Sequence, residues 1–60
     1  MFEGILSVDG FVAWVGQRTS VTVLVDYLRG AQCGWAGKGV VKCSINGIDV
    51  TRRFDPRDFA

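Results

Sequence analysis

The stretch Ser20-Val21-Thr22-Val23-Leu24-Val25-Asp26-Tyr27-Leu28 decides which of two folds this chain adopts. In a strand its valines alternate with mostly polar residues, whereas in a helix Leu24, Val25 and Leu28 share one face. Ser20 or the preceding threonine can cap the start of such a helix, and Gly30 can cap its end. Because β-branched residues lose rotamer freedom in a helix and pack well on a pleated surface, we expect a strand over residues 20–26. A helix at about 20–29 is the alternative.

Two short turn motifs bracket that stretch. Val8-Asp9-Gly10-Phe11 lies near the start of the chain, and Ile45-Asn46-Gly47-Ile48 lies toward its end. Asp-Gly and Asn-Gly between apolar runs favour two-residue type I′ turns, because both central residues need a positive φ that Asn, Asp and Gly tolerate best. We therefore expect a β-hairpin at each motif.

The remaining segments complete a predicted single all-β domain over residues 1–60. The expected strands are 2–8, 11–15, 20–26, 39–45 and 48–51, and the glycine-rich segment 30–39 is expected to be a loop. Asp55-Pro56 is typical of the start of a short helical turn, and Phe54 and Phe59 are expected to hold the tail against the body. Five short strands joined by tight turns predict a small, SH3-like, partly open barrel built on two β-hairpins. The helical alternative predicts an α+β arrangement, ββαββ.

Size and apolar content together predict self-association. A chain of 60 residues buries only about 60% of the surface that it exposes when unfolded, which leaves it marginal as a monomer. Hydrophobic residues make up 48% of this chain, more than one small core on one side of a thin sheet covers. We expect a homodimer or higher oligomer, with Trp14, Val12 and Leu24 at its interface.

Charge and cysteine content argue against several classes of protein. The formal net charge of +1 gives no basis for bulk electrostatic binding to nucleic acid. The chain has no histidine, and Cys33 and Cys43 alone are too few for a zinc site of the Cys/His type, so we expect no metal and no cofactor. No apolar run approaches the roughly 20 residues that span a bilayer, and Met1-Phe2-Glu3 lacks the basic start of a secretory signal. We expect a cytoplasmic protein without a membrane partner, whose cysteines are reduced.

The candidate binding residues lie in the second half of the chain. Segment 34–39 places Trp35 beside Lys38 among glycines, at a spacing that does not match a Walker A phosphate loop. Trp35 can stack on a base or on a partner, or fold back as a lid on the core. Arg52 and Arg53 with Arg57 and Lys42 can form a basic patch, or a solvated surface in which nearby aspartates neutralise part of the charge. The predicted site for a protein or a nucleic acid consists of Trp35, Lys38, Lys42, Arg52 and Arg53.

Catalytic chemistry has little support in this sequence. Without histidine, a cysteine or serine nucleophile needs another base, so we expect no enzyme and no catalytic residue. The leading hypothesis is a small non-enzymatic binding module, a protein-interaction regulator or inhibitor that acts as an oligomer through exposed strand edges. One alternative is a small nucleic-acid-binding β-barrel that uses the Trp/Lys loop and the arginine pair. A third hypothesis is an anion or nucleotide binder at a subunit interface.

Overall fold

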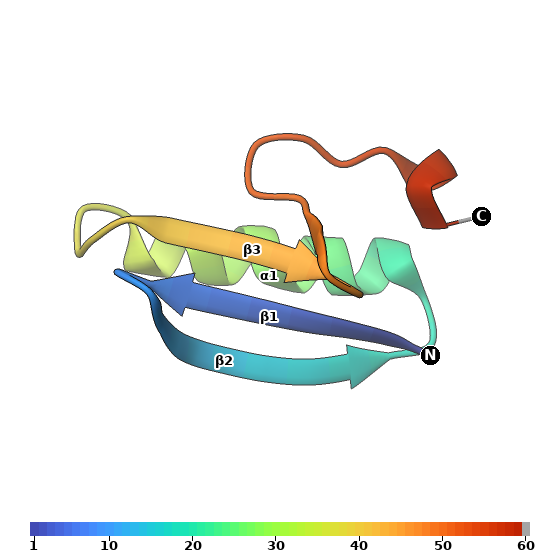
Figure 1. Cartoon of the computed structure of the whole chain (residues 1–60), viewed down its shortest axis with the longest axis horizontal. Coiled ribbons are helices and arrows are strands. Elements are labelled where there is room, and N and C mark those ends of the chain that lie inside the picture. The colour runs from blue at the N-terminus through green and yellow to red at the C-terminus, as the bar shows by residue number, and fades with distance from the viewer. Residues whose placement is uncertain (60) are drawn as a thin grey trace.

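Two hairpins and one helix make up the chain, and the computed structural model describes residues 1–59 (Figure 1). The elements in chain order are β1 (Phe2–Val8), β2 (Phe11–Arg18), α1 (Val21–Trp35), β3 (Val41–Ile45), β4 (Ile48–Asp49) and the 3-10 turn η1 (Pro56–Phe59). The order is the ββαββ arrangement that the helical alternative predicts.

The sheet is open and antiparallel throughout. Its strand order is β2-β1-β3-β4, so β1 and β3 are central and β2 and β4 form the edges. The helix α1 lies across one face, and the other face, turned toward the viewer in Figure 1, carries no helix within residues 1–59. The expectation of a small, sheet-rich domain is confirmed. The five-stranded SH3-like barrel is wrong, because residues 20–26 form no strand and the four strands do not close.

The first half of α1 forms because its apolar face completes the core. Ser20 is the N-cap, with an extended backbone and a hydroxyl that accepts a hydrogen bond from the Val23 N–H at 3.4 Å. Leu24, Val25 and Leu28 are buried beneath it. Burying a side chain of this size contributes roughly 1.5–3 kcal/mol, whereas a β-branched residue costs at most about 0.7 kcal/mol in a helix. Burial of this face therefore outweighs the local strand preference of the valines.

The second half of α1 runs through Gly30 and Gly34, which we expected in a loop. Each glycine disfavours a helix by about 1 kcal/mol relative to alanine. Contacts with the tail offset this cost: Arg29 Nη1 donates to the Thr51 carbonyl at 2.8 Å, and Gln32 Nε2 donates to the same oxygen at 3.4 Å. The prediction of a loop over residues 30–39 is thus wrong in its first half. The contacts that stabilise the helix there come from a segment far along the chain, which the local sequence does not reveal.

Both hairpin turns form as predicted. Asp9 and Gly10 have φ values of 53° and 84°, and Asn46 and Gly47 have φ values of 51° and 81°. All four residues therefore occupy the left-handed region that a type I′ turn requires.

Each turn is also tied to the other hairpin, one to strand β1 and the other to the residue just before β3. The Asp9 N–H donates to the Val40 carbonyl at 2.9 Å, and Asp9 Oδ1 accepts from the Val40 N–H at 2.8 Å. The Asn46 N–H donates to the Glu3 carbonyl at 2.9 Å, and Asn46 Oδ1 accepts from the Glu3 N–H at 3.0 Å. We call these two contacts the Asx clamps. They close the β1–β3 ladder at both ends.

The core lies between α1 and the strands β1 and β3. Its fully covered side chains are Leu6, Leu24, Leu28 and Ile45. Gly4 lets the helix approach the sheet closely, because a Cβ at this position would lie 2.8 Å from Leu24 Cδ1. Helix and sheet are thus packed without spare volume at this point.

The tail folds back onto the body through its aromatic residues, as expected. The rings of Phe54 and Phe59 stack with their centroids 5.9 Å apart, and Phe59 meets Phe2 edge-on at 6.2 Å. Asp55 directly precedes η1, and its Oδ1 accepts from the Arg57 N–H at 3.0 Å. The tail therefore covers one end of the core.

Candidate functional site

β2 is an edge strand eight residues long, and it pairs only with β1. Glu3 bonds toward β3, so by alternation Gly4 and Gly16 bond to one another across β1 and β2. The N–H and C=O of Val15 therefore point away from β1, to a side that no strand covers within residues 1–59. Such a free edge is a template for another strand.

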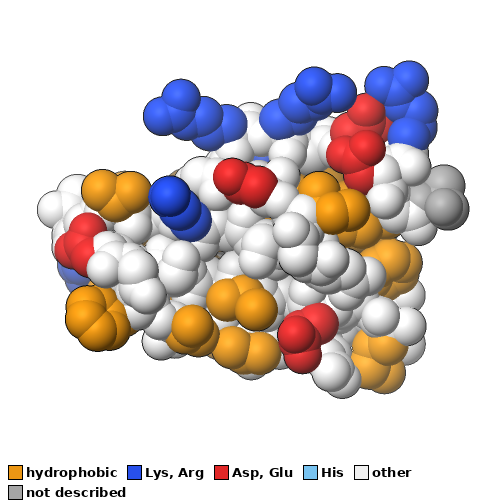
Figure 2. Space-filling view, viewed as in Figure 1, with side chains coloured by type: hydrophobic (Ala, Val, Ile, Leu, Met, Phe, Trp, Pro, Cys, Tyr) orange, Lys and Arg blue, Asp and Glu red, His pale blue; other side chains and the backbone are white. Residues whose placement is uncertain are grey.

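Apolar side chains flank this edge on both faces of the sheet. On the open face Val12 is 62% exposed and Val15 is 53% exposed. Figure 2 shows hydrophobic side chains gathered over β1 and β2 on this face. Phe11 at the start of β2 and Tyr27 on α1 are exposed as well. The edge thus combines the outward N–H and C=O of Val15, which no strand covers within residues 1–59, with an apolar surface.

A cluster of three side chains joins β2 to α1. The Trp14 and Tyr27 rings lie 4.5 Å apart, inclined at 31°, and the Arg18 guanidinium lies 5.8 Å and 5.5 Å from their centroids. Gly16 makes room for the indole, since any Cβ there would collide with it. Aromatic contacts and a cation over the rings hold β2 against α1 at this corner.

The three residues predicted at an oligomer interface occupy three different environments. Val12 is exposed on the open face, and Trp14 is half-buried against its own helix. Leu24 is 0% exposed, so its assignment to an interface is wrong. The reason is the helix, which turns Leu24 toward the sheet of its own chain.

A groove of about 720 Å³ lies along the opposite side of the sheet. Its walls are the end of α1 with Gln32, the start of β3, and the segment that follows β4. It brings together Lys42, Arg52 and Arg53, three of the five predicted binding residues. The two adjacent arginines share the groove because the chain bends at residues 51–52 rather than staying extended. Lysine and arginine side chains line this edge of the molecule in Figure 2.

The floor of the groove contains an unpaired length of β3. β4 covers only Ser44 and Ile45, and beyond it Thr51 Oγ1 accepts from the Cys43 N–H at 2.8 Å. By alternation the N–H and C=O of Val41 point to the same outer side as those of Cys43. Neither group of Val41 has a hydrogen-bond partner on that side within residues 1–59.

The charges around the groove are unequally paired. Asp49 Oδ1 accepts from the Thr51 N–H at 2.8 Å. Hydrogen bonds from Thr51, and after them the charges of Lys42 and Arg52, hold the pKa of Asp49 below its usual range. No ion pair within residues 1–59 engages Lys42 or Arg52. These two cations are available to a ligand.

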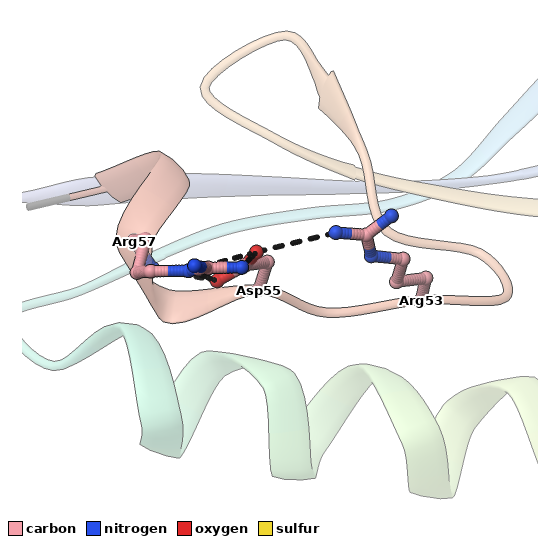
Figure 3. A network of polar contacts seen from close by, with 3 residues as sticks. All are labelled: Arg53, Asp55 and Arg57. Atoms are coloured by element: carbon pink, nitrogen blue, oxygen red, sulfur yellow. Dashed lines mark hydrogen bonds and ion pairs between the residues drawn. The ribbon is translucent and has the colours of Figure 1, made fainter.

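Arg53 belongs partly to a second network, shown in Figure 3. Asp55 lies between two arginines, with Arg57 Nη2 at 2.8 Å and Arg53 Nη2 at 3.3 Å from its Oδ2. The hydrogen bonds from Arg57, followed by those from Arg53, lower the pKa of Asp55 to about 2. This network fixes the start of η1 and leaves Arg53 only loosely held.

Trp35 and Lys38 are separate from the groove. The Lys38 Nζ lies 5.7 Å from the centroid of the Trp35 ring, and neither side chain lines the groove. Trp35 is the last residue of α1 and is 39% exposed. The predicted site therefore divides into a basic groove and a separate Trp/Lys pair.

The described residues offer limited scope for covalent or metal chemistry. Cys33 is exposed and Cys43 is buried, and both thiols are free. Burial raises the pKa of the Cys43 thiol, which disfavours the reactive thiolate. Residues 1–59 contain no group of three or more metal-ligating side chains. No helix in this range is long and apolar enough to cross a membrane.

Sequence reasoning missed the contact of Arg18 with the Tyr27 ring and the hydrogen bonds between Thr51 and the backbone of Cys43. It also missed the outward-facing N–H and C=O of Val41. One local signal for the groove was available, since an Asp two residues before a Thr favours a side-chain turn that ends a strand. No protein-family model, curated protein or solved structure matches the chain.

Proposed function

We propose that this chain is a non-enzymatic protein-binding module that acts as a homodimer, formed by strand addition between two β2 edges. The observation that supports it most is the eight-residue edge strand, whose outer side pairs with no strand within residues 1–59 and which apolar side chains flank on both faces. On that side the Gln17 carbonyl accepts from Arg18 Nη1 of its own chain at 2.7 Å, a contact that an added strand replaces. Main-chain hydrogen bonds supply affinity in strand addition, and the flanking side chains supply specificity.

A second copy fits this edge because antiparallel strands are self-complementary about a twofold axis. With the axis perpendicular to the sheet, the two four-stranded sheets become continuous, and both α1 helices lie on one face. Val12 and Val15 then extend the open-face apolar surface across the boundary, while Tyr27 of each copy approaches the partner helix. The edge carries one charged side chain, Arg18, which already lies over its own aromatic rings, so like charges do not face each other.

A standard interface buries about 800 Å² per partner, roughly one fifth of the 3985 Å² that this chain exposes. The proposed dimer therefore has to bury the exposed apolar side chains beside β2 as well as pair its backbone. Because a twofold contact uses the β2 edge of both copies, association closes at two copies instead of continuing into a filament.

Sedimentation velocity over a range of concentrations tests the proposal. We expect the wild type to have twice the 6.6 kDa mass of one chain and Val12→Lys to be a monomer. Val40→Lys is the matched control, because Val40 is 63% exposed against 62% for Val12 and lies outside β2. A wild type that stays monomeric, or two variants that dissociate equally, would overturn the proposal. Far-UV circular dichroism confirms that each variant is folded.

A backbone substitution distinguishes strand addition from stacking of the two open faces. Val15→Pro removes an N–H that points outward and is unpaired in the monomer, whereas Val15→Thr keeps it. We expect the proline variant to be monomeric and the threonine variant to dimerise. If both dimerise, the copies associate through their faces and not through β2.

A further inference from the structure

We infer that the groove beside β3 binds an extended acidic peptide segment of a partner protein, which lies in line with β4 as a short added strand. This site is separate from the β2 edge and does not depend on dimerisation. It lies on the opposite side of the sheet, where β4 ends early and leaves part of β3 uncovered.

The backbone in the groove provides the first half of the recognition. Val41 presents both an N–H and a C=O outward, one strand position beyond the point where Thr51 completes the edge. A peptide strand satisfies both groups at once, because its own backbone alternates donors and acceptors at the same spacing. The groove of about 720 Å³ is open along this edge, so the ligand enters without displacing a strand.

The charged side chains that line the groove provide the second half of the recognition. Three of the seven lysine and arginine side chains in the chain line the groove, against one of its six acidic side chains. That acid, Asp49, already accepts the Thr51 N–H, and Lys42 and Arg52 have no ion pair within residues 1–59. Carboxylates on alternate residues of an extended peptide point to the same side as each other, and those on neighbouring residues point to opposite sides, so one peptide can offer a carboxylate to each of the two cations that line the groove. The chain as a whole is nearly neutral, so the positive charge is a property of this groove.

A peptide fits these features better than single-stranded nucleic acid does. Small β domains that bind single strands use exposed aromatic side chains on which bases stack, and no aromatic residue lines this groove. Trp35 lies outside it and is already covered on one side by Lys38. A phosphodiester backbone also lacks the N–H that would pair with the Val41 carbonyl.

Fluorescence anisotropy with a labelled peptide that alternates glutamate and threonine tests the inference. We expect binding that weakens as salt is added, and no binding of a peptide in which lysine replaces glutamate. The double variant Lys42→Gln/Arg52→Gln should bind about twofold to thirtyfold more weakly, the effect of removing two exposed ion pairs. Lys38→Gln is the matched control, because it removes an exposed cation outside the groove and should leave affinity unchanged.

Two further measurements make the outcome decisive. N-methylation of the peptide N–H groups in one alternating set should abolish binding, while methylation of the other set should not, because only one set faces β3. Equal effects of the two sets, or no binding of the glutamate peptide at low salt, would overturn the inference. Tighter binding of an oligothymidylate, lost in the same double variant, would assign the groove to nucleic acid instead. Val12→Lys should bind the peptide normally, so a failure here is distinguishable from a failure of the β2 dimer.

Discussion

Replacing Gly30 with alanine tests whether the segment after Leu28 is helical, as the structure has it, or a loop, as the sequence pattern indicates. Gly30 lies inside α1, and a Cβ built on it meets no atom within 4 Å. Alanine is favoured over glycine in a helix interior by about 0.8–1.0 kcal/mol, and no contact opposes that gain here. We therefore expect Gly30→Ala to raise the free energy of unfolding by about 0.8–1.0 kcal/mol. For a domain of this size the midpoint of thermal unfolding then rises by roughly 4–8 °C.

Urea unfolding followed by far-UV circular dichroism measures the change. The wild type and the variant are compared at one protein concentration, because dimerisation makes apparent stability depend on concentration. Gly10→Ala is the control: its Cβ is equally unobstructed, but the φ of +84° should cost alanine about 1–2 kcal/mol. The two substitutions should thus act in opposite directions. A Gly30→Ala variant that is neutral or less stable, with an unchanged denaturant slope, would refute the helical assignment at this position.

Three other predictions follow from particular contacts. Gly4→Ala should lower the free energy of unfolding by about 1–3 kcal/mol in urea, because the added methyl overpacks the core against α1; unchanged stability would contradict the close approach. The pKa of Asp55 is lowered from 3.8 to about 2 by Arg57, so its stabilising effect is complete above pH 3.8 and is lost as the pH falls toward about 2. Thermal unfolding across that range should therefore depend less on pH in Asp55→Asn. An aromatic disulfide reagent should label Cys33 rapidly and Cys43 only as the protein unfolds, and equal rates would show that the core opens locally.

The hairpins were predictable because their information is local. Asp9-Gly10 and Asn46-Gly47 each place two residues that tolerate positive φ between apolar runs, and the turns formed there. The helix was not predictable with the same security, since Leu24 and Leu28 fit a helix while the neighbouring valines favour a strand. Burial against the sheet decides the outcome, and burial is a property of the whole fold.

The groove could be predicted only in part, because it is built by contacts between residues far apart in the sequence. Lys42, Arg52 and Arg53 were expected to act together, and the structure does bring them to one place. Trp35 was expected to join them in a flexible loop, but the helix extends to include it and turns it elsewhere. This part of the helix is held by the bonds from Arg29 and Gln32 to the Thr51 carbonyl, between residues 22 and 19 positions apart.

The Asx clamps also affect the chain while it is being made. They join Asp9 to Val40 and Glu3 to Asn46, pairs that are 31 and 43 positions apart. Because synthesis proceeds from the N-terminus, β1, β2 and α1 leave the ribosome before β3 does. In that interval β1 has an uncovered edge and Leu6 lacks part of its cover, a state that favours aggregation between neighbouring nascent chains. Pairing of β3 with β1 covers this edge, and the clamp at Asn46 is the last of these contacts to become available as the chain is made.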